Sequence, residues 1–388
     1  MKVISTERIP IKSWCAAPEA GCIDQAKNLA NLPFTFKHVA LMPDTHQGYG
    51  MPIGGVLATR GVVIPNAVGV DIGCGMCAIK TSLHAVELPA AKLKAILGEI
   101  RKRVPVGFAH NQFACPVSYM PENAVARPVV DREFEKARTQ LGTLGGGNHF
   151  IEIQKDGEGN VWVMIHSGSR NLGKQVADHY NTLAKDLNAR WFTQVDPKAD
   201  LAFLPHDSEE ARIYLNEMNY CLWFSKANRA EMMRMVKIAI QEIMPAGVVF
   251  GEALDIQHNY AAWENHFGEN VIVHRKGATA ARAGQLGIIP GSQGTCSYIV
   301  EGLGNPESFM SCSHGAGRRM GRKQAERTLN LADEIRKMDE KGIVHGMRTQ
   351  GDLDEAASAY KDIDTVMSEQ ADLVKIVTRL EPMAVVKG

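Results

Sequence analysis

Five side chains that can bind metal ions constrain this sequence more than any other feature, because each lies in a glycine-rich or turn-rich segment. They are Asp71, Cys74, His149, His166 and His258. The set contains one thiolate and exceeds what a closed tetrahedral site needs, which favours an open catalytic centre that can hold two ions. Its mixture of carboxylate, thiolate and imidazole suits Mn²⁺, Zn²⁺ or Co²⁺ better than Mg²⁺ or Ca²⁺, which prefer oxygen ligands.

Composition argues against several other classes of protein. Lysine and arginine balance aspartate and glutamate at 43 each, so any contact with nucleic acid must come from a local basic patch. The eight cysteines show no short-spaced disulfide pattern, and no apolar stretch approaches the roughly 20 residues that span a bilayer. No secretion signal opens the chain. We therefore expect a cytoplasmic protein with reduced thiols and no membrane contact.

The sequence predicts one large domain, residues 1–388, with an α+β core, because no repeat, linker or composition break divides it. Short β-branched or glycine-flanked runs predict strands at 38–42, 56–58, 62–64, 68–70, 271–273, 287–290, 298–300 and 383–388. Apolar spacing predicts helices at 93–104, 131–141, 208–244 and 319–338, and the methionine-rich stripe of the third predicts core packing. Prolines predict irregular structure at 105–130.

A predicted hairpin brings two of the histidines together. Strand-like runs at 148–154 and 161–166 flank a polar loop, 155–160, that contains two glycines. If the strands pair symmetrically about this loop, His149 lies opposite His166, with Cβ atoms about 4.5–5.5 Å apart. The side chains that would share their face are Ile151, Ile153, Trp162 and Met164.

A fourth histidine of interest, His314, has different neighbours. Small residues follow it in Gly315-Ala-Gly317, and five basic residues then cluster where a helix is expected to begin: Arg318, Arg319, Arg322, Lys323 and Arg327. A helix N-terminus with guanidinium groups binds anions, so we expect phosphate beside this histidine. An imidazole in that position can act as a nucleophile or a general base.

Each of these features also has a structural interpretation. His149 and His166 could be two hydrogen-bonded core histidines, and a buried free cysteine such as Cys74 usually serves as a small hydrophobic residue. The basic cluster after His314 could be a solvated helix face beside a turn. The sequence alone leaves these alternatives open.

Eight longer motifs resemble the RtcB family of RNA ligases, and they occur in that family's order over essentially the whole chain. The motifs are Pro43-Asp-Thr-His-Gln-Gly-Tyr-Gly50, Val68-Gly-Val-Asp-Ile-Gly-Cys-Gly75, Leu144-Gly-Gly-Gly-Asn-His-Phe150, His166-Ser-Gly-Ser-Arg170, His258-Asn-Tyr260, Arg275-Lys-Gly-Ala278, Gly291-Ser-Gln-Gly-Thr295 and Ser313-His-Gly-Ala-Gly-Arg318. The resemblance implies an RtcB-like fold around a two-metal cleft. It also implies GTP- and Mn²⁺-dependent joining of an RNA 3′-phosphate or 2′,3′-cyclic phosphate end to a 5′-hydroxyl end.

The same resemblance implies roles for individual residues. Cys74 would bridge two Mn²⁺ ions, with Asp71 and His149 on one and His166 and His258 on the other. His314 would attack the α-phosphate of GTP and become guanylated. The implied nucleotide contacts are Asn148, Asn259, Ser292, Gly315, Ala316, Tyr360 and Lys387, and the implied RNA or triphosphate contacts are Arg170, Lys276, Arg318 and Arg322. Asp44 is similar to a family aspartate near the active site.

Lys387 shows what the resemblance adds, because a lysine one residue from the end of a chain is usually frayed. The resemblance implies instead that the tail folds over the base. It further implies RNA fragments as substrates and an accessory activating protein as a possible partner. Two alternatives remain open from the sequence: a two-metal phosphoesterase that acts on cyclic or terminal RNA phosphates, and a non-catalytic RNA-binding paralogue.

Overall fold

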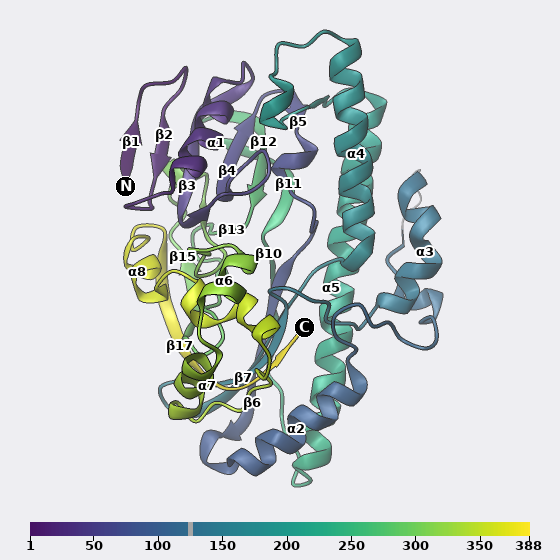
Figure 1. The fold of residues 1–388 in the computed structure, drawn as a ribbon. Helices are drawn as coiled ribbons and strands as arrows, with labels where there is room; N and C mark the ends of the chain where they lie inside the picture. Colours follow the sequence, from purple (N-terminus) through teal and green to yellow (C-terminus); the bar gives the residue numbers. More distant parts are fainter. Residues whose placement is uncertain (123–126) are drawn as a thin grey trace.

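The computed structural model describes residues 1–122 and 127–388, and it has the mixed α+β architecture expected from the sequence (Figure 1). One large sheet has the order β1–β2–β3–β4–β12–β11, and the other has the order β10–β6–β8–β7–β17–β15–β14. The strands of the first are β1 (Lys2–Ile4), β2 (Ile11–Ser13), β3 (Thr35–His46), β4 (Ile53–Thr59), β12 (Glu269–Lys276) and β11 (Asn259–His266). Those of the second are β10 (Leu254–Gln257), β6 (Gly75–His84), β8 (Asn160–Ser167), β7 (Phe150–Lys155), β17 (Val374–Lys387), β15 (Ser297–Gly302) and β14 (Leu286–Ile289).

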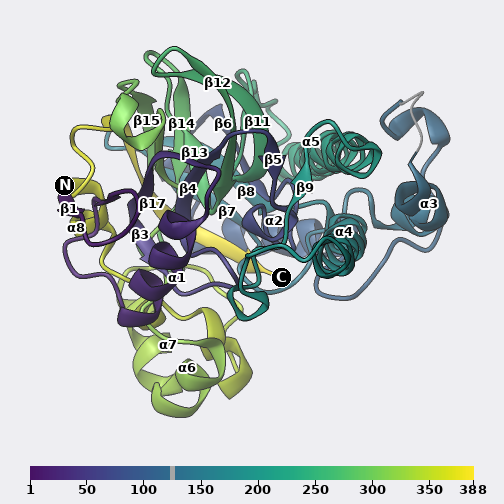
Figure 2. The same cartoon turned by 90° about the horizontal axis from the view of Figure 1, so that it is seen from above.

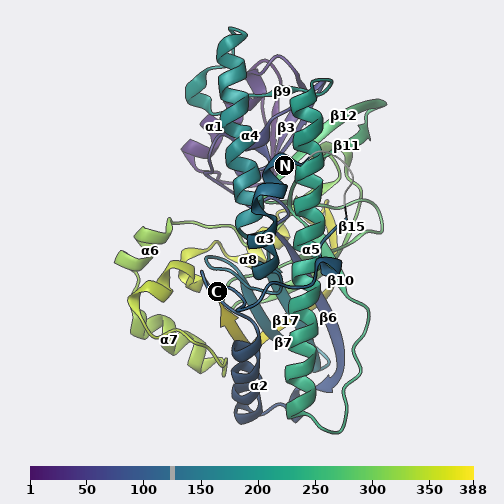
Figure 3. The same cartoon turned by 90° about the vertical axis from the view of Figure 1, so that its right-hand side faces the viewer.

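Helices cover these sheets from several directions. They are α1 (Ala20–Asn31), α2 (Ala90–Arg103), α3 (Pro128–Gln140), α4 (Arg170–Arg190), α5 (Glu209–Ile243), α6 (Arg322–Thr328), α7 (Leu331–Glu340) and α8 (Ile363–Ser368). The long helices α4 and α5 run side by side along one flank of the sheets (Figures 1 and 2), and α6 and α7 project on another side (Figure 3). Short ribbons pair β5 (Val62–Val63) with β9 (Leu204–Pro205) and β13 (Ala278–Ala280) with β16 (Ser311–Ser313). No helix in the described ranges is both long and apolar enough to cross a membrane.

Helix α5 is the longest helix of the described residues, and local signals define both of its ends. The Ser208 hydroxyl accepts a hydrogen bond from the Ala211 N–H, which caps the first turn. Glu209 and Glu210 lie in that turn, where negative charge favours the helix dipole. Met244 and Pro245 follow its last residue. The predicted helix at 208–244 and the core role of its methionines are confirmed, since Met218, Met232 and Met233 are buried.

The predicted helices at 93–104 and 131–141 are confirmed as α2 and α3, and the strand expected at 383–388 is the end of the longer β17. Helix α4 was not predicted. Its sequence contains Gly173 and several asparagines, which weaken intrinsic helix propensity. Burial of Leu172, Val176 and Tyr180 against neighbouring elements supplies the stabilisation that propensity lacks.

Three other predictions are corrected. The single helix expected at 319–338 is broken into α6 and α7, because the Asn330 side chain accepts a hydrogen bond from the Asp333 N–H and caps a new helix. Residues 68–70 are not a strand but part of a turn, in which Gly69 has a φ of +96°. The region 105–130, expected to be irregular, is so over most of its described part, but α3 begins at Pro128; residues 123–126 lie outside the described residues.

The hairpin of β7 and β8 forms, but its register differs by one residue from the prediction. Phe150, not His149, lies opposite His166, and Lys155 lies opposite Val161. The shift arises because 156–160 connect the last pair, and the Asp156 carboxylate fixes this connection by accepting hydrogen bonds from the backbone N–H groups of residues 158 and 160. Trp162 and Met164 consequently pack with Phe150 in a different cluster from Ile151 and Ile153.

Strand β17 carries the C-terminal residues into the middle of the second sheet, where it pairs with β7 on one side and β15 on the other. Lys387 pairs with Phe150, the first residue of β7. The end of the chain is thereby placed near the centre of the molecule (Figure 1) and beside the segment that contains His149.

Candidate active site

The five predicted metal ligands come together at the strand ends of the second sheet. Cys74 immediately precedes β6, His166 is near the end of the antiparallel β8, and His149 immediately precedes β7. His258 lies between β10 of one large sheet and β11 of the other. Its N–H donates to the Cys74 carbonyl at 3.0 Å, so backbone hydrogen bonding ties this segment to the turn that contains the thiol.

The ligand atoms form two groups that share one sulfur. Those of Cys74, His166 and His258 all lie within 4.8 Å of one another, and those of Asp71, Cys74 and His149 do the same. His166 Nε2 is 3.2 Å and His149 Nε2 is 3.5 Å from the sulfur, and His149 Nε2 is 3.2 Å from Asp71 Oδ2. This arrangement can hold two cations with the thiolate between them.

Backbone carbonyl groups orient two of the imidazoles. The Nδ1–H of His149 donates to the Leu144 carbonyl at 2.9 Å, and that of His166 donates to the Asn148 carbonyl at 3.1 Å. Each of these hydrogen bonds leaves Nε2 as the free donor atom for a metal. His258 Nδ1 is buried and has no hydrogen-bond partner among the described residues. A buried nitrogen without a partner is costly unless a cation binds it, so the cluster fits a metal centre better than a set of satisfied core histidines.

Burial sets the protonation states of these ligands. It lowers the pKa of His166 and of His258 well below the usual value, so both imidazoles are neutral. Burial, reinforced by the charge of Asp71, raises the pKa of the Cys74 thiol well above its usual value. For Asp71 itself burial favours the neutral acid, but the hydrogen bond and charge of His149 outweigh it and lower the pKa. Binding of a cation must therefore displace the thiol proton.

His314 lies next to this cluster, with its ring centroid 4.8 Å from that of His258. Its Nδ1 is 2.6 Å from Oδ2 of Asp44, and the same oxygen accepts the backbone N–H groups of His314 and Gly315. Asp44 is fully buried. Burial alone would raise the pKa of this carboxyl group, but the charge and hydrogen bond of His314 lower it. Asp44 thus fixes the tautomer of His314 with a lone pair on Nε2.

A pocket opens on one side of His314. Among the residues that line it are most of the predicted nucleotide contacts and two of the predicted phosphate contacts: Asn148, Ser292, Gly315, Ala316, Tyr360, Lys387, Arg318 and Arg322. Glu355, buried in its wall, pairs with Arg318 at 3.1 Å and with Arg322 at 2.9 Å. The pocket is therefore lined by three cationic side chains, Arg318, Arg322 and Lys387, and by one carboxylate, Glu355. This excess of positive charge suits an anion.

Lys387 reaches this pocket because β17 places it there. Its ammonium group donates to the backbone carbonyls of Gly147 and His149, the second at 3.1 Å. Burial lowers the pKa of this lysine to about 8. Its side chain is therefore held in place and is easily neutralised at mildly alkaline pH.

A second cleft shares His314, Arg318 and Arg322 with the first pocket and is also lined by Asp71, Cys74, His258, Asn259 and Lys276. The ammonium group of Lys276 donates to the carbonyls of Tyr49 and Asn66, and burial lowers its pKa to about 8. Arg170 lines neither cavity. Its guanidinium donates to the Thr143 hydroxyl and the Gly107 carbonyl, and its charge contributes to the lowered pKa of Asp71.

Two carboxylates shape the site in ways that the sequence did not predict. The family resemblance placed Asp44 near the active site without a specific role, and the structure shows that it accepts three hydrogen bonds from the His314 segment. Glu355 was not singled out, and it also accepts a short hydrogen bond from the Tyr360 hydroxyl. No sequence pattern around Glu355 indicates this function, because its partners Arg318 and Arg322 come from a distant segment.

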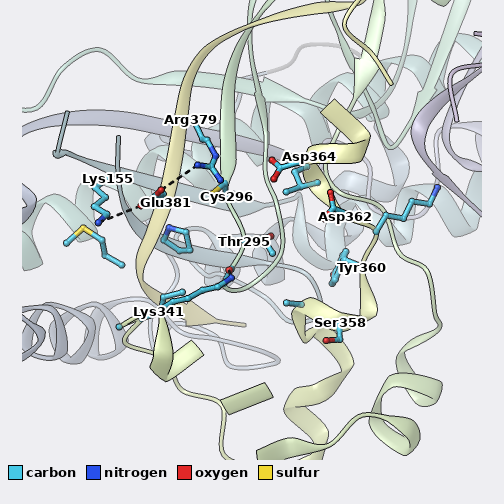
Figure 4. Close-up of a pocket in the computed structure, with 18 of the residues that line it drawn as sticks. Lys155, Thr295, Cys296, Lys341, Ser358, Tyr360, Asp362, Asp364, Arg379 and Glu381 are labelled. Carbon is cyan, nitrogen blue, oxygen red and sulfur yellow. Dashed lines mark hydrogen bonds and ion pairs between the residues drawn. The ribbon is translucent and has the colours of Figure 1, made fainter. Parts of the chain in front are cut away.

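Figure 4 shows a separate cavity between the 294–296 turn, β17 and the segment that leads into α8. Lys155 and Arg379 both pair with Glu381 on its wall, each at 3.6 Å. Among the described residues that line this cavity, Tyr360 is a predicted nucleotide contact, and Arg319 belongs to the basic cluster that follows His314. None of the candidate metal ligands is among them. The candidate ligands lie elsewhere: His166 lines the first pocket, and Asp71, Cys74 and His258 line the second cleft.

Comparisons with known proteins agree with the geometry. A sequence profile of the family described as tRNA-splicing ligase RtcB matches residues 25–388. The chain is 40% identical to the RNA-splicing ligase RtcB of Escherichia coli, over 100% of this chain and 99% of that protein. It is 33% identical to the tRNA-splicing ligase RtcB of Nanoarchaeum equitans, over 94% of this chain and 91% of that protein. It is also 33% identical to the RNA-splicing ligase RtcB of Mycobacterium bovis, over 94% of this chain and 100% of that protein.

Replacing the shared ligand should affect the metal content more than replacing a terminal one. We expect Cys74→Ala to lose both ions, because its sulfur belongs to both ligand groups, whereas His258→Ala should lose one. Metal per chain would be measured by plasma mass spectrometry after dialysis against Mn²⁺. Cys77→Ala is a matched control, since it removes an equally buried thiol from the hydrophobic core. Undiminished metal in Cys74→Ala would contradict the shared site.

Proposed function

The chain belongs to the RtcB family, and we propose that it is an RNA ligase that uses GTP and Mn²⁺ to join 3′-phosphate or 2′,3′-cyclic phosphate ends of RNA to 5′-hydroxyl ends. The observation that carries this proposal is the position of His314. Its Nδ1 is held by a buried carboxylate, and the residue lines both the anion-binding pocket and the cleft that contains the metal ligands. A phosphoesterase with two metals needs no such histidine.

The ligand set, a carboxylate and a thiolate with three imidazoles, is compatible with Mn²⁺ as it is with Zn²⁺ or Co²⁺, and the family resemblance favours Mn²⁺ among them. Asp71 and His149 would hold one ion, His166 and His258 the other, and Cys74 both. Bound there, the ions would polarise phosphoryl oxygens and stabilise the charge of attacking and leaving oxygens.

The first step would be attack of His314 Nε2 on the α-phosphorus of GTP. A P–N bond forms, the bond to the β-phosphate oxygen breaks, and pyrophosphate leaves. The imidazole gains positive charge as it attacks, and the Asp44 carboxylate at 2.6 Å from Nδ1 stabilises that charge. Arg318, Arg322 and Lys387 would hold the anionic nucleotide in the pocket.

RNA would enter by the second cleft. There Lys276 and Asn259 lie beside the metal ligands, and Arg170 contributes positive charge close to Asp71. The 3′-phosphate would displace His314 from the guanylate, which gives an RNA 3′-end activated with GMP. The 5′-hydroxyl would then attack this phosphorus, form the phosphodiester and release GMP. A cyclic end must first be hydrolysed to the 3′-phosphate. An accessory activating protein remains part of this proposal as a possible partner.

The two alternatives predict different behaviour. A two-metal phosphoesterase needs the cluster but no nucleotide, whereas a non-catalytic RNA-binding protein needs neither. The balanced charge of the chain disfavours the second, because binding driven by release of counterions requires a basic surface.

Incubation with α-³²P-GTP and Mn²⁺ tests the proposal directly. We expect the wild-type chain to carry an acid-labile label on a denaturing gel and His314→Ala to carry none. His345→Ala provides a matched control, since that buried histidine contacts Asp339 away from the cluster. An unlabelled wild-type chain that still releases phosphate from RNA ends would favour the phosphoesterase.

The carboxylate behind the nucleophile should matter for rate more than for binding. Asp44→Asn keeps an oxygen that can accept hydrogen bonds but removes the charge that stabilises the imidazolium, so guanylation should slow about 100-fold. Rapid-quench measurement of label formation at saturating GTP would show this, with the GTP dissociation constant nearly unchanged. A rate within twofold of the wild type would contradict the role of Asp44.

Nucleotide binding should weaken at alkaline pH. Lys387 has a pKa of about 8, so it is a cation below this pH and loses its charge as the pH rises above it. We expect GTP affinity, measured calorimetrically, to fall up to about tenfold between pH 7 and pH 9, since about one side chain in ten stays charged one unit above its pKa. Lys387→Arg should flatten this profile, because arginine stays charged. An equally steep profile in that variant would assign the effect to another group, such as Lys276.

A further inference from the structure

Two adjacent polar side chains in the middle of α5, Asn228 and Arg229, are completely buried, although most of the buried residues of this helix are apolar. Neither lines either of the two cavities that flank the metal ligands. Burial of an amide and a guanidinium is unfavourable unless each donor and acceptor finds a partner. Their partners show what these two residues do.

Arg229 joins two of the ligand-bearing segments. Its Nη1 donates to the carbonyl of Gly73 at 3.2 Å and to the carbonyl of Ser167 at 2.9 Å. Gly73 precedes Cys74, and Ser167 follows His166. The other side of the guanidinium forms a bidentate ion pair with Asp255 of β10, with two contacts of 2.7 Å. The hydrogen bonds of Arg229 thus fix the backbone beside two of the ligands, and the ion pair with Asp255 holds the guanidinium in place.

Asn228 holds the third segment. Its Oδ1 accepts the N–H groups of Gly142 and Thr143 at 2.7 and 3.1 Å. Its Nδ2 donates to the Thr143 carbonyl, the Ser167 hydroxyl and the Gly168 carbonyl at 3.1–3.3 Å. Every hydrogen-bonding group of this side chain therefore has a partner in the segments around the metal cluster.

The Ser167 hydroxyl extends this contact to a further ligand. It donates to the Leu144 carbonyl at 2.8 Å, which is the same oxygen that accepts the Nδ1–H of His149. A continuous set of hydrogen bonds thus runs from Asn228 to the imidazole of His149.

Glycines allow the turn before β6 to approach α5 closely. Gly73 has a φ of +75°, and a Cβ atom there would lie 2.8 Å from the Ser225 hydroxyl oxygen on the helix. A Cβ atom at Gly75 would lie 2.1 Å from the Ile256 carbonyl oxygen and 3.1 Å from Arg229 Nη1. A larger residue at Gly73 would push the Cys74 turn away from α5, and one at Gly75 would push it away from β10.

We propose that Asn228 and Arg229 are positioning residues for the metal centre: they hold the segments of Cys74, His166 and His149 at the separations that two bound cations require. The inference rests on the metal centre of the proposed function. It assigns to α5, whose sequence predicted only core packing, a direct effect on metal affinity.

The test is titration of the full-length chain with Mn²⁺ alone, followed by electron paramagnetic resonance of the free ion. Arg229→Lys keeps the charge but loses the fork that reaches two carbonyls and a carboxylate at once. We expect it to weaken Mn²⁺ binding about 10- to 100-fold, as loss of an outer partner of a metal ligand typically does. Asn228→Ala should weaken Mn²⁺ binding to a similar extent. With two variants, the test still works if one of them fails to fold.

A control variant on the same helix distinguishes positioning of the metal ligands from a contribution to fold stability alone. Glu217 is equally buried, but its partners are Tyr180 and the first N–H groups of α3. Glu217→Ala should lower the thermal unfolding temperature and leave Mn²⁺ affinity unchanged. Unchanged affinity in both Arg229→Lys and Asn228→Ala would overturn the inference, as would an equal loss in Glu217→Ala. A wild-type chain that binds no Mn²⁺ would overturn the proposed metal centre itself, which distinguishes the two failures.

The Co²⁺-substituted proteins provide a readout of geometry. Coordination of a thiolate to Co²⁺ gives a charge-transfer band. The d–d bands of the Co²⁺ ion depend on how its ligands are arranged. We expect both bands to change in Arg229→Lys and to be retained in Glu217→Ala. Spectra of Arg229→Lys that match the wild type at full occupancy would overturn the positioning role.

Discussion

The site depends on one sulfur atom that belongs to two groups of ligands. For Cys74 to serve both, a carboxylate and three imidazoles must come within a few ångströms of it, and the thiol and the imidazoles must be buried at the same time. Antiparallel pairing of β6, β8 and β7 meets most of this requirement, because the start of one strand lies beside the end of the next. His258 completes the set from the connection between the two large sheets.

Burial then determines how the cluster can be used. It keeps the imidazoles of His166 and His258 neutral and the Cys74 thiol protonated, so a cation that binds there must displace the thiol proton. The same burial makes the Asp44–His314 contact effective, because a charge interaction is stronger away from water. The metal ligands and the nucleophile thus depend on the same exclusion of solvent, although different segments provide them.

The sequence singled out five candidate ligands that the structure brings together, because each lies in a local pattern of glycines and turns that no core helix would need. It did not predict the hairpin register, which depended on how the Asp156 carboxylate closes a connection of odd length. The roles of Glu355 and Arg229 also could not be predicted from the sequence. Their partners lie many residues away in the sequence. A buried charged residue also has no periodic pattern by which the sequence alone would identify it.

Lys387 could be found only through family resemblance, and the reason is an irregularity in the pairing of β17 with β7. Pairing with β7 shifts register between Pro382 and Ala384, so the residues on either side of this bulge no longer alternate in phase. Leu380 before the bulge and Val385 after it consequently pack in the same cluster, together with Phe150.

Without that shift, alternation along the strand would place Val386 on the face of Leu380 and turn Lys387 away from Phe150, its partner across the pair. With it, Lys387 faces the pocket, while Ala384 and Val386 fill the core on the opposite side. The N–H of Gly388 also donates to the His149 carbonyl. One strand register therefore determines both the cationic side chain of the pocket and the backbone position of a metal ligand, so the two parts of the site cannot shift independently.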